Sequence, residues 1–189
     1  LYLCDKNLET ISDYYSNARH KLLAEVCYAA KYEGDLIKTH HIKHEQTNKD
    51  SPSQLCTVLA RSFADIGDIV RGKDLYLGYD DKEKDERKKL ENKLKTIFTQ
   101  IYNDVTKTSD KNGAEERYGK DPDFFKLRED WWTANRSTVW EALTCEVGSG
   151  TYFRHTCGTG KDRTATNNNC RCATNDVPTY FDYVPQYLR

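Results

Sequence analysis

The stretch LARSFADIGDIVRGKDLYLG, residues 59–78, decides how the rest of the chain is interpreted. Its apolar residues recur at three- and four-residue steps, which is the spacing of one face of an α-helix. Asp65 lies four residues after Arg61, and Asp68 lies three residues before Arg71. Such neighbours form ion pairs on a helix and lower the pKa of a carboxyl group. The spacing therefore predicts a scaffold helix rather than a catalytic pair of acids.

Periodicity predicts four helices in all, over residues 8–34, 54–72, 82–107 and 124–147. Gly34 and Gly72 are predicted helix ends, and Gly67 is predicted to mark a close approach by a neighbouring helix. The polar stretches 37–53 and 108–123 are predicted loops. From Gly148 onward turn residues and cysteines replace the periodicity. The expected fold is a mostly α-helical bundle with long loops and an irregular C-terminal segment that disulfides hold to the helices.

Composition excludes some functions. The 189 residues carry 29 Lys and Arg against 30 Asp and Glu, so the overall charge predicts no nucleic-acid partner. No apolar run approaches the ~20 residues of a membrane span, and this part of the chain is expected to be soluble. Seven cysteines and no methionine lead us to expect a piece of a longer, disulfide-bonded chain from an oxidising compartment.

A metal or nucleotide site has weak support. His155, Cys157, Cys170 and Cys172 could act as zinc ligands, but their H-x-C and C-x-C spacing is not that of a zinc knuckle. The segment GTGKDRT, residues 158–164, lacks the first glycine and the hydroxyl of a phosphate loop. We therefore expect no cofactor and no enzyme, and a zinc-binding or secreted enzyme remains the weakest alternative.

Two basic clusters are candidate binding sites. One is in the third predicted helix and the other is in the C-terminal segment; their residues are Lys88, Lys89 and Lys93, and Arg154, Lys161, Arg163 and Arg171. The helix also carries many acids, which favours a solvated face with internal ion pairs. In the C-terminal segment no helical partner is available, and arginine and lysine there suit the anionic groups of sulfated or sialylated glycans.

Three motifs together resemble one known family. Residues 59–78, WWTANRSTVWEALTC (131–145) and CRCATNDVPTYFDYVPQYLR (170–189) are similar, in order and spacing, to the Duffy-binding-like domain. The similarity is greatest to the alpha class at the head of the malaria parasite's variant erythrocyte membrane proteins. The opening LYLCDKNLETI (1–11) also fits. The resemblance implies one domain fragment, with the end of the first subdomain in residues 1–50 and the second, helical subdomain in 51–189.

The resemblance also implies a disulfide pattern. It pairs Cys56 with Cys157 and gives Cys4 a partner outside this chain. Two further bridges would then join Cys27, Cys145, Cys170 and Cys172, where Cys170 and Cys172 are too close to pair with each other. The choice between the two remaining pairings stays open.

The function that the resemblance implies is adhesion. The family displays such domains on the outer face of the infected erythrocyte membrane, as parts of membrane-anchored proteins. The implied partners are erythrocyte receptors, heparan-sulfate-type and blood-group glycans, giving rosettes, and host antibodies that recognise a variant antigen. The alternative is a structural scaffold and antigenic surface whose receptor site lies in other subdomains. No receptor contact residue transfers by motif.

Overall fold

The computed structural model describes residues 17–47, 53–76, 79–107 and 111–189. Its helices are α2 (Ala18–Thr47), α3 (Ser53–Arg71), α4 (Asp81–Lys107), α5 (Lys111–Tyr118) and α6 (Phe125–Leu143), followed by the short 3-10 helices η1 (Phe181–Tyr183) and η2 (Gln186–Leu188). Within these ranges there is no β-strand, and one isolated β-bridge joins two loop residues. The predicted mostly α-helical class is confirmed.

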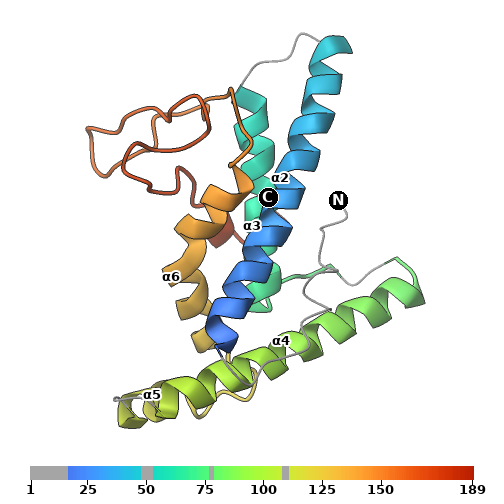
Figure 1. The fold of residues 1–189 in the computed structure, drawn as a ribbon, viewed down its shortest axis with the longest axis vertical. Coiled ribbons are helices and arrows are strands. Elements are labelled where there is room, and N and C mark those ends of the chain that lie inside the picture. The colour runs from blue at the N-terminus through green and yellow to red at the C-terminus, as the bar shows by residue number, and fades with distance from the viewer. Residues whose placement is uncertain (1–16, 48–52, 77–78, 108–110) are drawn as a thin grey trace.

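The helices form a small bundle. α2, α3 and α6 lie side by side, and α4 crosses one end of them and carries α5 (Figure 1). The loops of residues 148–172, called the C-terminal loops below, lie at the opposite end, where α3 begins and α6 ends (Figure 1). The last residues of the chain return along α3, where Arg189 binds Asp65 and Asp68. None of the described helices is long and apolar enough to span a membrane.

One hydrophobic core joins α2, α3, α4 and α6. At its centre the buried ring of Phe63 lies 5.1 Å from Trp132 and 5.2 Å from Trp140. A Cβ atom added to Gly67 would lie 2.8 Å from Cζ2 of Trp132, so the predicted close approach at this glycine is confirmed. α2 shares this core with the helices that follow residue 50, so the core does not mark a subdomain boundary there. The predicted boundary near residue 50 stays a prediction.

The first helix does not end at Gly34, as predicted; α2 continues to Thr47. A Cβ atom on Gly34 would lie inside the contact distance of the Leu143 carbonyl oxygen and 2.9 Å from its carbonyl carbon. The glycine therefore marks a crossing of α2 and α6 and not a helix end. Residues 37–47 belong to the helix and not to the predicted loop, and residues 8–16 of the prediction lie outside the described part.

The other predicted elements agree with the structure except in one place. α3, α4 and α6 occupy the predicted ranges to within a few residues, and Gly72 ends α3 with φ 70°. The predicted loop 108–123 contains the short helix α5. Its eight residues offered too little apolar periodicity to predict a helix. The segment after Gly148 consists of turns, bends and the two 3-10 helices, as expected.

Candidate binding surface

The ion pairs predicted around Asp65 and Asp68 are present in part. Asp68 Oδ1 accepts a hydrogen bond from Arg71 Nη2 at 3.1 Å, as predicted. Asp65 does not pair with Arg61, which is exposed, but with Arg189, whose Nη1 lies 3.0 Å from Oδ1. Arg189 also binds the second carboxyl oxygen of Asp68. The prediction of an Arg61 pair was wrong because the C-terminal segment brings a closer arginine to this face of α3.

The two acids also differ from expectation in their pKa values. Burial raises the pKa of Asp65 and of Asp68, although the charge of Arg189 opposes the rise in both. The predicted lowering was therefore wrong. A raised carboxyl pKa can indicate a functional acid. Here both oxygens of Asp68 bind arginines, so neither is free to contact a substrate, and the two acids link α3 to the C-terminal Arg189.

A second buried carboxylate, Asp182 of η1, holds the C-terminal segment to the helices. Trp132 Nε1 donates a hydrogen bond to its Oδ2 at 2.9 Å, and Arg136 binds both oxygens at 2.8 and 2.9 Å. Arg71 donates to its main-chain carbonyl. Asp182 and Arg189 thus anchor the motif at residues 170–189 to the helices of the scaffold.

Glu129 of α6 completes this network on its outer side. Its Oε1 lies 3.2 Å from Arg71 Nη1, and its Oε2 binds the ammonium of Lys73. Burial raises the pKa of Glu129, but the hydrogen bonds and charges of Lys73 and Arg71 outweigh it and bring the pKa below its ordinary value. The carboxylate is therefore stabilised in its charged form.

The disulfides differ from the implied pattern. Cys56 pairs with Cys170, with Cα atoms 5.6 Å apart, and Cys157 pairs with Cys172, with Cα atoms 5.4 Å apart. The pairing of Cys56 with Cys157 was wrong. Trp140 Nε1 donates a hydrogen bond to the main-chain carbonyl of Cys170 at 3.1 Å. This contact holds Cys170 against the helices, next to Cys56 at the start of α3.

The remaining cysteines are not bridged as expected. Because Cys170 and Cys172 pair with other residues, neither is available to Cys27 or Cys145. Both of the latter are free thiols in the structure, Cys27 partly buried and Cys145 exposed. Cys4 lies outside the described residues.

The C-terminal loops present a preformed basic tip. Cys157 and Thr164 exchange two main-chain hydrogen bonds of 3.1 and 2.9 Å, and the disulfide to Cys172 fixes the same point. These contacts close the loop 157–164 at its base. Lys161 and Arg163 are exposed within it. The loop thus holds two cations in solvent on a backbone constrained at both ends.

The four predicted basic residues of this segment do not share one role. Arg154 is exposed, and its guanidinium lies 5.0 Å from the centre of the Phe153 ring, which is itself exposed. Arg171 instead donates to Thr144 Oγ1 at 2.7 Å and to the carbonyl of Glu141 at 2.6 Å. Arg171 therefore belongs to the scaffold. Phe153 was not predicted to belong to this surface, although its position beside Arg154 in a loop could have indicated that role.

The lysines of α4 belong to a different surface. Lys88 and Lys89 are exposed and Lys93 is partly buried. α4 crosses the end of the bundle opposite the C-terminal loops, so the two predicted clusters do not form a single site (Figure 1).

The three cysteines of the alternative zinc site are not free to bind a metal. Cys157, Cys170 and Cys172 all carry disulfides. Among the residues that the structure describes, no three His, Cys, Asp or Glu side chains gather as a metal site.

Comparison with known proteins identifies relatives of this arrangement. The family model described as "Duffy binding domain" matches residues 1–189. No curated protein matches the chain. The NTS-DBL1(alpha-1) domain of Plasmodium falciparum membrane protein 1 (PfEMP1) from the varO strain is 38% identical, with a TM-score of 0.74. The alignment covers 98% of this chain and 39% of that one.

Domains of a second class are also similar. The ICAM-1-binding DBLbeta domain of the P. falciparum PfEMP1 IT4var13 is 32% identical, with a TM-score of 0.67, over 99% of this chain and 39% of that one. The same domain bound to ICAM-1 gives a TM-score of 0.66 at 32% identity, over 98% of this chain and 40% of that one. The chain thus spans less than half the length of these relatives.

Proposed function

This chain belongs to the Duffy binding domain family, and we propose that it is part of an adhesion domain that attaches an infected erythrocyte to host cells. Its similarity to PfEMP1 domains, one of them solved with ICAM-1, supports a receptor-binding role. The proposed location is the outer face of the infected erythrocyte membrane. There the domain would meet receptors on other erythrocytes, giving rosettes, and host antibodies.

The proposed ligand is an anionic glycan, bound by the loops around residues 153–164. The observation that supports it most is the closed loop 157–164, which exposes Lys161 and Arg163 while Asp162 is its only acid. Neither cation forms an ion pair with another described residue, so neither charge is neutralised by the scaffold. Sulfate and carboxylate groups bind such side chains through charge-assisted hydrogen bonds.

The loop geometry favours sulfated or sialylated glycans over neutral blood-group sugars. A loop fixed by a disulfide and a β-bridge loses little conformational freedom on binding, which improves affinity. The exposed ring of Phe153, beside Arg154, adds an apolar surface next to the cations. A neutral glycan would use that ring but gain nothing from the charges.

The test is salt elution of the 189-residue chain from immobilised heparin. The variant Lys161→Glu/Arg163→Glu should elute at clearly lower salt than the parent chain. The control Lys107→Glu/Lys120→Glu changes the net charge equally at exposed positions near α5, and its elution should shift much less. A second comparison, Lys88→Glu/Lys89→Glu, asks whether the α4 lysines contribute. Equal shifts for all three variants would show that only net charge matters and would reject the loop as the site.

A scaffold role is the second candidate. It is favoured by the core residues within the family motifs, such as Phe63, Trp132 and Cys170, which are fully buried. It is also favoured by the 39% coverage of the varO structure, which leaves room for a receptor site in the rest of a longer domain. Cell-binding by this chain should then be absent while a longer chain that contains it binds. Retention of this chain on host erythrocytes, lost in Lys161→Glu/Arg163→Glu, would contradict the scaffold role.

A further inference from the structure

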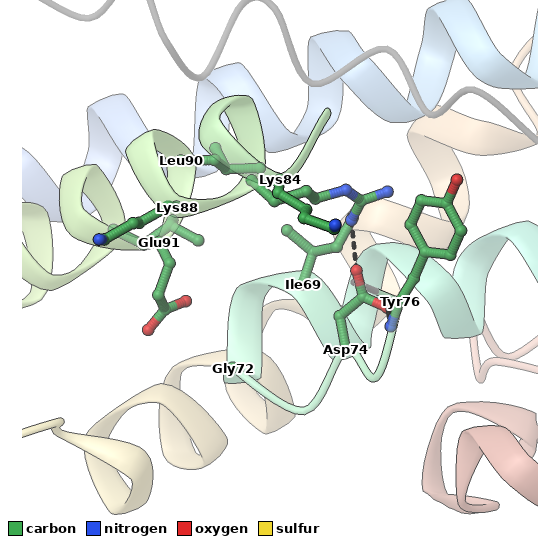
Figure 2. Close-up of a pocket in the computed structure, with 10 residues that line it drawn as sticks. Ile69, Gly72, Asp74, Tyr76, Lys84, Lys88, Leu90 and Glu91 are labelled. Carbon is green, nitrogen blue, oxygen red and sulfur yellow. Dashed lines mark hydrogen bonds and ion pairs between the residues drawn. The ribbon is translucent and has the colours of Figure 1, made fainter. Parts of the chain in front are cut away.

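A pocket of about 500 Å³ lies between the end of α3, the segment 72–76 and the first half of α4 (Figure 2). It is on the α4 side of the bundle, away from the loop 157–164, and it does not enter the proposed glycan binding. Gln186 of η2 donates a hydrogen bond to Asp74 in its wall at 3.0 Å. Its apolar part is formed by Ile69 of α3 and by Leu90 and Leu94 of α4. A volume of this order suits a small ligand.

Two ion pairs fix the walls of the pocket. Arg87 of α4 binds Asp74, and its guanidinium lies 5.0 Å from the centre of the Tyr76 ring. Glu91 binds the fully buried Arg128 at 2.7 and 3.0 Å. These four charges are neutralised within the protein. The walls are therefore preformed, and the paired groups do not decide the charge of a ligand.

Two further lysines at the pocket leave a positive charge. Lys84 and Lys88 lie one helical turn apart on α4 and both line the pocket (Figure 2). Among the residues that the structure describes, the ammonium group of Lys84 pairs only with Asp81, at 3.3 Å, and the Asp81 side chain is fully exposed. Pairs of this kind contribute little. Lys88 forms no ion pair with any described residue.

We propose that this pocket binds a single-chain amphipathic anion, such as an alkyl sulfate or a medium-chain fatty carboxylate. The alkyl chain lies over Ile69, Leu90 and Leu94, which are themselves nearly buried. The main favourable contribution is the removal of the alkyl chain's own apolar surface from water. The anionic head lies at the rim between the ammonium groups of Lys84 and Lys88. An apolar floor alone would accept a neutral or cationic amphiphile equally well, so the two lysines determine the sign of the head group.

The test is calorimetric titration of the chain with four probes below their micelle concentrations. These are octyl sulfate, octyl glucoside, octyltrimethylammonium and inorganic sulfate. Octyl sulfate should bind with a stoichiometry of one. The cationic and neutral amphiphiles should bind at least about tenfold more weakly, and inorganic sulfate should not saturate the site. Similar affinity for the three amphiphiles, or no saturable binding of octyl sulfate, would overturn the proposal.

Two charge-reversal variants test whether the amphiphile binds in this pocket. Lys84→Glu/Lys88→Glu should weaken octyl sulfate at least about tenfold and reduce its preference over octyltrimethylammonium. The control Lys82→Glu/Lys89→Glu makes the same charge change at exposed positions of the same helix that do not line the pocket, and it should weaken binding much less. All these positions are exposed, so folding is retained and can be checked by thermal melting. Equal losses in the two variants would contradict binding in this pocket.

Discussion

Gly34→Ala gives a direct test of how α2 and α6 pack. In an isolated helix this change would stabilise by about 1 kcal/mol, because glycine is the poorest helix former after proline. In the structure the new methyl group would meet the main chain of Leu143, 2.9 Å from its carbonyl carbon and closer still to its oxygen. A backbone carbonyl cannot rotate away as a side chain can, so the two helices must separate.

The expected result follows from the balance of these two effects. Overpacking of a tight core contact costs about 1–3 kcal/mol, and separation of α2 from α6 also loosens apolar contacts around Val139 and Val26. The gain in helix propensity offsets part of this cost, so we expect a net destabilisation of about 1–2 kcal/mol. For a chain of this length that corresponds to a melting temperature lower by about 2–8 °C.

Urea unfolding followed by circular dichroism measures this difference. Ala24→Gly, at an exposed position of the same helix, should destabilise by about 1 kcal/mol through propensity alone. Gly148→Ala, where no atom lies within 4 Å of the added Cβ, should be close to neutral. If Gly34→Ala proved more stable than the parent chain, propensity would dominate and the close crossing of α2 and α6 would be refuted.

Three further changes test other parts of the scaffold by the same unfolding measurement. Gly67→Leu should destabilise by well over 1 kcal/mol because the indole of α6 already lies 2.8 Å from the position of the new Cβ; a neutral result would contradict this packing. Glu129→Gln should cost about 1 kcal/mol near neutral pH. Because the pKa of Glu129 is lowered, its contribution is present above the ordinary pKa of glutamate and is lost as the pH falls through the lowered value, so the parent and the variant should converge in acid; a constant difference would argue against it. Replacing Cys56 and Cys170 together by alanine opens a cross-link between residues 114 apart and should cost about 4–5 kcal/mol; an unchanged midpoint would mean that the bond does not form.

The sequence predicted those parts of the fold that depend on local spacing. The apolar periods of α3, α4 and α6 and the left-handed Gly72 were correct because helix formation and helix ends are determined within a few residues. Gly34 carried the same local signal as Gly72. Only the position of α6 shows that it allows a crossing instead of ending a helix.

Interactions between distant residues could not be predicted in this way. The partner of Asp65 is Arg189, 124 residues later in the chain, whereas i,i+4 spacing pointed to Arg61. The same limit applies to the disulfides. Cys157, Cys170 and Cys172 lie within 16 residues of one another, and the choice between them depends on which loop reaches the start of α3.

The cations of this molecule differ in whether the scaffold already binds them, and this difference separates the candidates for its binding surface from the structural residues. Arg71 and Arg128 are buried and each binds carboxylates and main-chain carbonyls together, which uses the planar, multiple donors that lysine lacks. A count of basic residues in the sequence includes such arginines, although their donors are already occupied. The cations available to a ligand are instead those on constrained loops or at a pocket rim. By this criterion Lys161 and Arg163 are candidates for the glycan surface and Lys88 for the α4 pocket, whereas Arg171 is excluded because the scaffold already occupies its guanidinium.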